Sequence, residues 1–440
     1  MKTDKKEKAL LALYNLAQFS TMPLVLPALA AVCISRGKYR HQFLKRMGWV
    51  SPPASLDSRA RPVWIHTMSL GEFNAARPLI KAIRGSFPGL KLVLSASTAT
   101  GLSAISRSGL ADEGFVTALP FDFLPVVART VRVLRPACFL LVETDIWPNL
   151  LWFLKRQGTY SFLVNGSISE ASARRLGRLP GAAGLIYSPF EFIGMQSGDD
   201  MARLLRLAVP SSRVRDCGNL KFDYVPSRIT EDEKKRLFRA TGFEPGAVII
   251  AAGSTHPGEE KIIVEAFSAL LGTIPLARLI IAPRDISRSG EVKKIIRAHG
   301  LGCETRSDYR PGTGKGHKVF LLDSLGELER FYSLSRVAFV GGSLVPVGGH
   351  NILEPAALGV PVIFGPYMES FRQTARMFQE AGAGFMVKNS REILKTLGAL
   401  LEDEGRRKMA CNAASSILKK NQGAVKRYLD MIRPYIETFR

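Results

Sequence analysis

The chain has 440 residues, a formal net charge of +23 at pH 7 and 46% hydrophobic residues. This length suits two domains better than one core, and the hydrophobic content excludes a disordered or low-complexity chain. The five scattered cysteines form no CxxC pair or Cys/His cluster, which argues for a reducing compartment and against a zinc site. The high positive charge predicts an anionic partner, and the candidates are nucleic acid, a membrane surface and a phosphorylated substrate.

The N-terminus combines an apolar stretch with basic flanks. Four lysines precede the run from Ala9 to Ser35, and five Lys or Arg residues without an acid follow it in Arg36–Arg46. The run is long enough to cross a bilayer, but it contains Asn15, Gln18 and two prolines. We predict a membrane anchor over residues 1–35, either single-pass or lying in the interface against an anionic lipid surface. A buried first helix of the domain is the alternative.

From residue 62 on, short apolar runs alternate with amphipathic stretches, which indicates βαβ units and parallel sheets. In the first half we expect strands at Pro62–Met68, Lys91–Ala96, Gly114–Leu119, Ala137–Val142, Tyr160–Asn165, Gly184–Ser188 and Arg213–Cys217. Helical stretches between them include Phe73–Gly85 and Leu124–Leu134. After a polar stretch, strands are expected at Ala247–Ala252, Leu276–Ala282, Lys318–Leu322, Val337–Val340 and Pro361–Phe364. The pattern predicts two α/β, Rossmann-like domains, residues 36–218 and 219–423, and a C-terminal helix within 424–440 that packs back on the first domain.

The stretch VWIHTMSLGEFNAARPLI, from Val63 to Ile80, places a carboxylate where a strand ends and a helix begins. Ser69 and Glu72 have the spacing of a capping box, in which the glutamate side chain accepts the N–H of the capping serine. In open α/β sheets, however, ligands bind outside the carboxyl ends of the strands. Glu72 is therefore a candidate catalytic residue as well as a candidate cap.

Six further motifs place polar or glycine-rich residues straight after an apolar run. They are ETDIWPNL with Glu143, NGSIS, GNLKFD with Lys221, AGSTHPGEE, APRD with Arg284, and GGSLVPVGGHNILEPAALGVPVIFGP. Any one of them alone is more simply a polar turn. Six at the same edge of two sheets predict the two walls of a ligand cleft.

The second-half motifs contain candidate nucleotide contacts. A helix start expected over Asn351–Leu358 offers backbone N–H groups to a phosphate, and Gly341 and Gly342 allow backbone to approach a ligand. Glu354 can bind ribose hydroxyls or only complement the helix dipole. Arg284 can clamp a phosphate or carboxylate, or form a surface ion pair. His256 and His350 are more simply hydrogen-bonded scaffold than ligand donors.

In this order, the motifs resemble those of the 3-deoxy-D-manno-oct-2-ulosonic acid (Kdo) transferase family of lipopolysaccharide synthesis. The resemblance runs from about Arg36 to the last helix and rests on IHTMSLGE, VETDIWPNLL, NGSIS, GNLKFD, GSTHPGEE, LGELERFY and GGSLVPVGGHNILEPAALGVPVIFGP. It implies a B-type glycosyltransferase fold, with two Rossmann-like domains facing a central cleft, on the cytoplasmic face of the inner membrane of a Gram-negative bacterium. Members transfer Kdo from CMP-Kdo to a hydroxyl of the tetraacylated, bisphosphorylated lipid A precursor (lipid IVA), with inversion at the anomeric carbon.

The resemblance also implies roles for individual residues. The first domain would bind the acceptor, with Glu72 as general base and with Glu143 and Lys221 stabilising the leaving group and the transition state. The second domain would bind the nucleotide sugar, and its CMP contacts would be Pro283, Arg284, Leu325, Gly326, Glu327, Asn351, Ile352, Leu353 and Glu354. Many members have Pro-Arg-His where this chain has Asp285 after Arg284, so a histidine contact to the nucleotide is not expected there.

This chemistry agrees with the residue types. An inverting transfer needs a base on the acceptor hydroxyl and stabilisation of departing CMP on the opposite face. A cationic side chain and a helix N-terminus can stabilise the single phosphate, so no metal and no cofactor are expected. These requirements favour the base over the cap for Glu72. The alternatives are another B-type sugar transferase, a nucleotide-sugar epimerase and, less favoured because the basic residues are dispersed, a nucleic-acid-binding protein.

Overall fold

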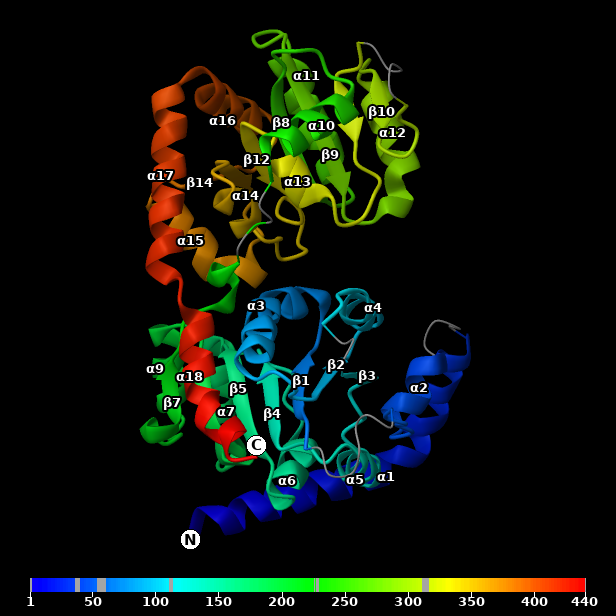
Figure 1. Cartoon of the computed structure of the whole chain (residues 1–440), viewed down its shortest axis with the longest axis vertical. Coiled ribbons are helices and arrows are strands. Elements are labelled where there is room, and N and C mark those ends of the chain that lie inside the picture. Colours follow the sequence, from blue (N-terminus) through cyan, green and yellow to red (C-terminus); the bar gives the residue numbers. More distant parts are fainter. Residues whose placement is uncertain are drawn as a thin grey trace. The chain divides into compact units, whose positions relative to one another are not determined.

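The computed structural model describes residues 2–35, 40–53, 61–110, 114–224, 226, 229–310 and 316–439. The chain divides into two compact units, with unit 1 formed by Met1–Asp223 and Asn421–Arg440 and unit 2 by Tyr224–Lys420 (Figure 1). Each unit contains a seven-stranded sheet, and all the strand pairs are parallel. The predicted α/β class with two Rossmann-like domains is confirmed.

The sheet of unit 1 has the strand order β3-β2-β1-β4-β5-β6-β7. Its strands are β1 (Val63–Thr67), β2 (Leu92–Ala96), β3 (Phe115–Ala118), β4 (Cys138–Val142), β5 (Tyr160–Gly166), β6 (Phe190–Met195) and β7 (Val214–Asp216). All five residues of β1 are buried, with Val63 and Ile65 in the core on one face and Trp64 in the core on the other. Burial on both faces explains why this strand appears in the sequence as a continuous apolar run.

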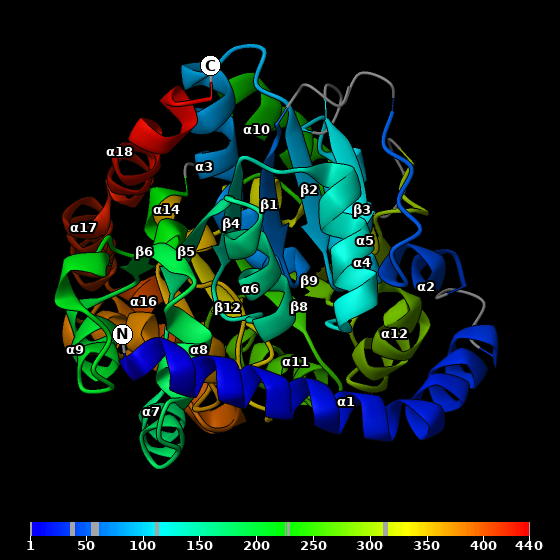
Figure 2. The same cartoon turned by 90° about the horizontal axis from the view of Figure 1, so that it is seen from below.

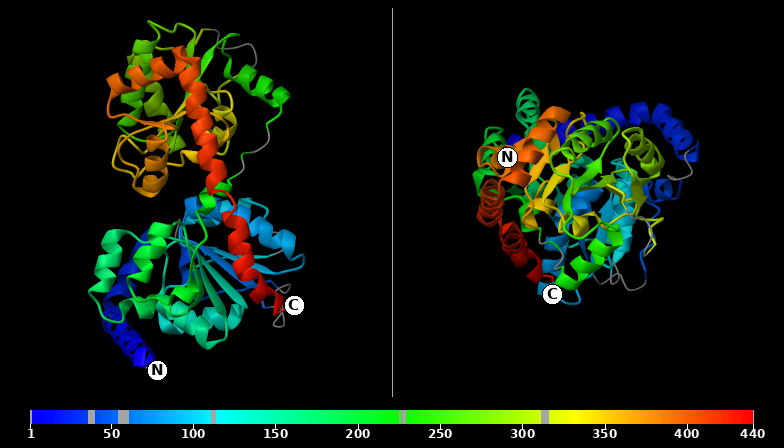
Figure 3. Two further views of the ribbon diagram at one scale, coloured as in Figure 1. Left: turned by 90° about the vertical axis from the view of Figure 1, so that its left-hand side faces the viewer. Right: turned by 90° about the horizontal axis from the view of Figure 1, so that it is seen from above.

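Helices cover both faces of this sheet. They are α3 (Leu70–Ser86), α4 (Ala99–Arg107), α5 (Leu124–Leu134), α6 (Pro148–Arg156), α7 (Glu170–Gly177), α8 (Ala182–Tyr187), α9 (Gly198–Leu205) and α18 (Ala424–Glu437), with 3-10 turns η2 (Ser211–Arg213) and η3 (Leu220–Asp223). Side chains of α3, α4 and α18 pack in the core on one face, and those of α5, α6, α8 and α9 in the core on the other. Figure 3 shows α18, in red, lying alongside the sheet of unit 1.

One predicted strand is wrong. The segment Gly184–Ser188 lies mostly in the short helix α8, and the strand of this region is β6. Short apolar runs do not distinguish a strand from a buried helix by periodicity alone. Here the helix is favoured by its packing against α1 and by a hydrogen bond of 2.9 Å from Trp152 Nε1 to the carbonyl oxygen of Leu185.

The N-terminal helix α1 (Lys2–Ser35) belongs to unit 1 and contacts α8 and α2 (Arg40–Arg46) (Figure 2). Within the described ranges, no helix is both long enough and apolar enough to cross a membrane. Asn15, a residue that makes the stretch a poor membrane span, exchanges hydrogen bonds of 2.8 and 2.9 Å with the side chain of Asn149. Gln18 accepts a third bond, of 3.1 Å, from the same amide.

The sheet of unit 2 has the order β10-β11-β9-β8-β12-β13-β14. Its strands are β8 (Val248–Thr255), β9 (Ala277–Pro283), β10 (Cys303–Thr305), β11 (Val319–Leu321), β12 (Val337–Val340), β13 (Val362–Phe364) and β14 (Gly384–Met386). The edge strands β10 and β14 were not predicted from the sequence. Each has only three residues, which is too short to show an alternating pattern.

The helices of unit 2 also lie on both faces. They are α10 (Glu231–Thr241), α11 (Glu259–Leu270), α12 (Ser289–Ala298), α13 (Leu328–Tyr332), α14 (Leu353–Ala357), α15 (Arg372–Glu380), α16 (Ser390–Glu402) and α17 (Glu404–Asn421), with η4 (Ile286–Arg288) and η5 (Glu369–Phe371). Helices α11, α12 and α16 pack on one face, and α10 and α13 on the other.

Candidate active site

The strand orders place some of the expected functional residues at topological switch points: Glu72 and Glu143 in unit 1, and Asn351–Glu354, after β12, in unit 2. In unit 1 the chain moves outward from β1 through β2 and β3, then returns to β4 on the other side of β1. Ligands bind at the carboxyl ends of strands where the order reverses in this way. Glu72 follows β1, and Glu143 and Asp145 follow β4. The switch point of unit 2 lies between β8, which is followed by His256 and Glu259, and β12.

Glu72 lies in the first turn of α3, and its side chain does not complete a capping box. Ser69 is the N-cap and accepts the Glu72 N–H at 3.4 Å. The Glu72 carboxylate, however, accepts the N–H of Met68 at 2.5 Å through Oε2 instead of the N–H of Ser69. No hydrogen bond to Glu72 Oε1 is found among the residues that the structure describes. The capping interpretation is therefore only half right.

The environment of Glu72 favours its protonated form. Burial is the main cause and, with the negative charge of Glu143, raises the pKa of Glu72 to about 8. Asp145 contributes in the same direction, whereas the Met68 N–H and the Lys221 ammonium act against it. A carboxylate with a pKa near the working pH is a much stronger base than an ordinary glutamate and is still ionised in part. Perturbed carboxyl groups of this kind are frequent in active sites.

Glu143 forms an ion pair with Lys221 beside Glu72. The distance from Lys221 Nζ to Glu143 Oε1 is 3.2 Å, and each side chain is 16% exposed. Asn165, at the end of β5, donates to the same oxygen at 3.3 Å. Both Glu143 and Asn165 have left-handed backbones, with φ of 64° and 57°. Such strain in non-glycine residues is retained where the surrounding structure enforces it, often at functional sites.

Lys221 lies in η3, whose backbone is held by two asparagine side chains from outside the turn. Asn165 Oδ1 accepts the Leu220 N–H at 2.9 Å, and Asn219 Oδ1 accepts the Lys221 N–H at 2.9 Å. Asp223 closes the same turn on the start of α18, because its carboxylate accepts the N–H groups of Gly423 and Val425 at 2.6 and 2.5 Å. The C-terminal helix therefore contributes to the position of Lys221.

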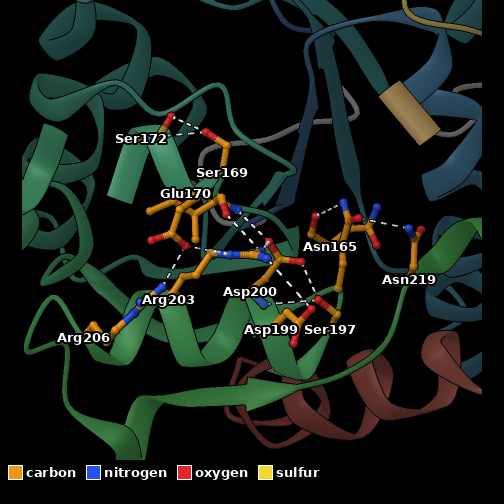
Figure 4. A network of polar contacts seen from close by, with 12 residues as sticks. Asn165, Ser169, Glu170, Ser172, Ser197, Asp199, Asp200, Arg203, Arg206 and Asn219 are labelled. Atoms are coloured by element: carbon orange, nitrogen blue, oxygen red, sulfur yellow. Dashed lines mark hydrogen bonds and ion pairs between the residues drawn. The ribbon is translucent and has the colours of Figure 1, made fainter. Parts of the chain in front are cut away.

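The NGSIS motif after β5 is fixed by a polar network that reaches α9 (Figure 4). Asp200 accepts the Ile168 N–H at 3.0 Å and pairs with Arg203 at 3.2 Å. Glu170 pairs with Arg206 at 2.9 Å. Figure 4 also shows Asn165, which lies on the side of the view where Asn219 is drawn. The motif residues after Asn165 thus support the loop, while Asn165 itself contacts the Glu143–Lys221 pair.

In unit 2, the buried carboxylate of Glu259 organises the loop after β12. It accepts the backbone N–H groups of His256, Gly342, Ser343 and Leu344 at 2.9, 2.7, 2.9 and 2.8 Å. Gly341 is needed for close approach to β8, because a Cβ there would lie 2.4 Å from the carbonyl oxygen of Ser254. The expectation that Gly341 makes room for a ligand is thus replaced by a contact between neighbouring strands.

His256 and His350 form a pair next to this loop. Their Nε2 atoms are 2.8 Å apart and their rings are stacked with centroids 5.1 Å apart. Burial and the charge of Arg284 lower the pKa of His350 to about 4, and burial also lowers that of His256. The pair is therefore neutral at physiological pH, with one Nε2–H donating to the other ring.

Arg284 follows β9 with an exposed side chain, and its N–H donates to the Thr255 carbonyl oxygen at 2.9 Å. Pro283, the last residue of β9, is buried. Asp285, the residue after Arg284, caps η4 by accepting the N–H and the hydroxyl of Ser287 at 3.0 and 2.7 Å. Asp285 therefore has a structural role that does not depend on a nucleotide.

The remaining expected nucleotide contacts lie after β11 and β12. Leu325 is 65% exposed, Gly326 has φ of 83°, and Glu327 forms two bonds of 3.2 Å to Arg306. A helix was expected to start within Asn351–Leu358, and the helix found there, α14, has only five residues.

Asn351 and Glu354, at the start of α14, form hydrogen bonds with their immediate neighbours. Asn351 Oδ1 accepts the Leu353 N–H at 3.1 Å, so that backbone amide is not available to a phosphate. Ile352 is the N-cap of α14, and its side chain makes no capping hydrogen bond. Burial raises the pKa of Glu354 to about 7, although the hydrogen bond from Asn351 acts to lower it. Across the described segments, no group of three or more His, Cys, Asp and Glu side chains can hold a metal ion.

Comparisons with known proteins point to one family. A family model described as 3-deoxy-D-manno-octulosonic-acid transferase (kdotransferase) matches residues 41–224. The chain is 30% identical to the 3-deoxy-D-manno-octulosonic acid transferase of Haemophilus influenzae over 418 residues, which cover 94% of this chain and 96% of that one. It is 33% identical to the corresponding Bordetella pertussis protein over 388 residues, with 86% and 88% coverage.

A crystal structure of a glycosyltransferase from Rickettsia africae has a TM-score of 0.57 at 13% identity, covering 86% of this chain and 98% of that one. This last similarity supports the B-type glycosyltransferase fold. The identity over nearly the full length of the Haemophilus influenzae protein goes further: the chain belongs to the 3-deoxy-D-manno-octulosonic acid (Kdo) transferase family and is a glycosyltransferase.

Proposed function

We propose that this enzyme moves Kdo from CMP-Kdo to a hydroxyl of the tetraacylated, bisphosphorylated lipid A precursor, with Glu72 as general base and CMP as leaving group. The observation that carries the proposal is Glu72 itself. It lies at the switch point of unit 1 and is 5% exposed, with one carboxylate oxygen bonded to Met68 and, among the described residues, no hydrogen bond to the other. Its raised pKa is suited to taking a proton from an alcohol near neutral pH.

The transfer step balances without a metal or cofactor. Glu72 takes the proton of the acceptor hydroxyl, and the hydroxyl oxygen forms a bond to the anomeric carbon of Kdo. The bond from that carbon to the phosphate oxygen breaks, and CMP leaves with its electron pair. Since attack and departure occur on opposite faces of the sugar, the anomeric configuration inverts.

Glu143 and Lys221 stabilise the charges of this step. The Lys221 ammonium is the cation that acts on Glu72, and Glu143 holds it at 3.2 Å. A cation that is fixed before the reaction stabilises developing negative charge without reorganisation. The ion pair supports the roles that the family resemblance implies for both residues.

The donor nucleotide is assigned to unit 2. Arg284 follows β9, adjacent to the switch point, and its charge acts on His350 and on Glu354. We assign the CMP phosphate to Arg284, the ribose hydroxyls to Glu354, and the remaining contacts to the turns at Leu325–Glu327 and Asn351–Leu353.

A donor screen tests the proposed function. The purified protein is incubated with the lipid precursor and, in parallel, with CMP-Kdo, UDP-sugars and ADP-sugars. Mass spectrometry is expected to find Kdo added to the lipid with CMP-Kdo alone. Transfer from a UDP-sugar or ADP-sugar, or epimerisation of such a donor without a lipid product, contradicts the proposal and supports one of the alternative B-type activities.

Arg284→Ala is expected to lower CMP affinity by about ten- to a hundredfold, because a charge-assisted contact contributes about 1.5–3 kcal/mol. Isothermal titration calorimetry measures the change. Arg297→Ala is the matched control, since Arg297 is also exposed but lies in the last turn of α12. Because a helix that follows a strand in a βαβ unit ends at the opposite edge of the sheet, Arg297 lies away from the strand end that carries Arg284. Unchanged CMP binding by a folded Arg284→Ala protein contradicts the phosphate assignment.

We also propose that α1 lies in the interface of the inner membrane at its cytoplasmic face. Its docking side is polar, since Tyr14 donates to Asp122 at 3.0 Å and Asn15 pairs with Asn149. Its outer side is apolar, with Leu13 and Leu16 exposed by 61% and 67%. A helix with apolar residues outward and lysines at its start suits a surface of anionic lipid.

Leu13→Gln with Leu16→Gln is expected to weaken binding to anionic lipid vesicles by about ten- to a hundredfold, because two leucines lose roughly half of their burial free energy in lipid. Vesicle flotation measures the binding, and Met409→Gln, which changes another exposed apolar residue, is the control. Deleting residues 1–35 should also release the protein without unfolding it, because Asp122 and Asn149 can bind water instead. Aggregation of the deletion variant supports the alternative of a buried first helix.

A further inference from the structure

Next to Glu72, a buried chain of hydrogen bonds joins the ends of β1, β2 and β4. Trp64 Nε1 lies 2.7 Å from Ser95 Oγ, and Ser95 Oγ lies 2.9 Å from His66 Nδ1. His66 Nε2 lies 2.9 Å from Asp145 Oδ2. His66 and Ser95 are completely buried. Neither the general base nor the Glu143–Lys221 pair explains why this chain is present.

The donors and acceptors of this chain fix its protonation. An indole N–H only donates, so Ser95 Oγ accepts from Trp64. When the proton of a neutral His66 ring is on Nε2, Nδ1 accepts the Ser95 hydroxyl proton. Burial lowers the pKa of His66, which keeps the ring neutral with its proton on Nε2, directed at Asp145. Hydrogen bonds from His66 and Ser97 overcome the effect of burial and lower the pKa of Asp145. Asp145 is therefore a carboxylate at neutral pH.

Asp145 is also connected to Glu72 through Ser97 and Met68. Ser97 Oγ donates to Asp145 Oδ2 at 2.6 Å. The Ser97 N–H donates to the Met68 carbonyl oxygen at 3.2 Å, and the Met68 N–H donates to Glu72 at 2.5 Å. Three consecutive hydrogen bonds, through Ser97 and the backbone of Met68, thus link the two carboxylates.

The charges around Glu72 come from three sides of this end of the sheet. Glu143 and Asp145, after β4, disfavour its ionisation, and Lys221, in η3, favours it. His66, in β1, faces Asp145, and the positive charge of Arg46 in α2 acts on His66. Asp145 is therefore a fixed negative charge that affects Glu72 without being part of the Glu143–Lys221 pair.

We propose that Asp145 is a positioning residue for the transfer reaction, which keeps a fixed negative charge beside Glu72 and holds its carboxylate in place through Ser97 and Met68. The proposal rests on the proposed function of Glu72 as general base. It assigns the buried His66–Ser95–Trp64 chain the task of keeping Asp145 ionised and oriented. Asp145 touches neither the acceptor hydroxyl nor CMP in this assignment.

The test is the pH dependence of turnover, measured with CMP-Kdo and the lipid precursor. Wild-type turnover is expected to rise with pH through about 8, because Glu72 must lose its proton to act as a base. Asp145→Asn removes the neighbouring negative charge, so ionisation of Glu72 becomes easier. The acidic limb is expected to move to lower pH by about one unit, which is typical of one nearby charge in a partly buried site.

Asp145→Asn also disturbs the hydrogen bond from Trp147, so a second substitution is made with it. Asp145 Oδ2 accepts from His66 and Ser97, and Oδ1 accepts from Trp147 Nε1 at 2.9 Å. An asparagine can keep its oxygen toward the first two donors only by turning its NH₂ group toward the indole N–H. Asp145→Asn is therefore also made together with Trp147→Phe, which removes that donor. Trp147→Phe alone keeps the charge and is the matched control, whose acidic limb should stay at the wild-type pH.

A second measurement needs no turnover. Infrared difference spectra recorded against pH follow the protonated carboxyl of Glu72, which is identified by its absence in Glu72→Gln. Both Asp145→Asn proteins should titrate this band at lower pH than the wild type and Trp147→Phe. An unmoved acidic limb and an unmoved band in a folded Asp145→Asn protein overturn the inference. If Glu72→Gln retains full turnover, the proposed base fails first, and the infrared result still decides whether Asp145 acts on Glu72.

Discussion

Glu72→Gln is expected to lower Kdo transfer by at least roughly a hundredfold, because general-base catalysis commonly contributes about 10² to 10⁴ in rate. The glutamine keeps the size of the side chain, and its amide oxygen can still accept the Met68 N–H that Glu72 accepts at 2.5 Å. The start of α3 should therefore remain intact. Turnover is measured with CMP-Kdo and the lipid precursor, and CMP binding by calorimetry should be unchanged.

The stability of the same variant provides an independent check with a definite sign. Glu72 has a pKa of about 8 in the folded protein, above its ordinary value, so folding favours the protonated side chain. That contribution is fully present at acidic pH and is lost as the pH rises through about 8. Glutamine resembles the protonated form at every pH. The melting temperature of Glu72→Gln relative to wild type should therefore rise as the pH is raised.

Glu72→Ala separates the base from a purely local role. A residue that only supports the start of α3 predicts near-normal turnover in Glu72→Gln and a stability loss on the order of 1 kcal/mol in Glu72→Ala. A base predicts that both variants lose turnover to a similar extent. Near-wild-type transfer by Glu72→Gln rules out Glu72 as the base.

The sequence predicted the position of a residue correctly where that position depends only on neighbouring residues in the chain. Glu72 could be placed at the end of a strand because the apolar run before it and the helical pattern after it are both local features. The partner of its carboxylate was not predictable, because the N–H groups of both Met68 and Ser69 lie within about one helical turn of Glu72 along the chain. Only the backbone geometry at the N-terminus of α3 selects the Met68 N–H.

Contacts between distant segments escaped prediction for a different reason. His66 lies in β1, Ser95 lies in β2 and Asp145 follows β4, so their contacts depend on the strand order of the sheet. The same is true of α1, whose Asn15 and Gln18 reduce its apolar character in the sequence but dock on Asn149 in the structure. The expected helix at Asn351–Leu358 was overestimated because its length could not be read from one apolar cluster.

Lys221→Met is expected to lower the turnover number by about 10² to 10³, as is typical when one preorganised electrostatic contact to a reacting group is removed. Lys221 is the cation whose charge favours ionisation of Glu72, and it lies 3.2 Å from Glu143. Without it, the carboxyl groups of Glu72, Glu143 and Asp145 face one another with less compensation. The acidic limb of the pH profile should therefore move to higher pH, opposite to the shift expected for Asp145→Asn.

The pairing of Lys221 with Glu143 predicts how their losses combine. Glu143→Gln should also lower turnover, because the amide no longer attracts the ammonium and Lys221 loses its fixed position. The double variant should then lose little more than Lys221→Met alone, since each residue acts through the other. Steady-state kinetics of the two single variants and the double variant measure this coupling, and Lys221→Arg tests whether charge without the same geometry is sufficient. Losses that simply multiply in the double variant would mean that Glu143 and Lys221 act on separate parts of the transition state.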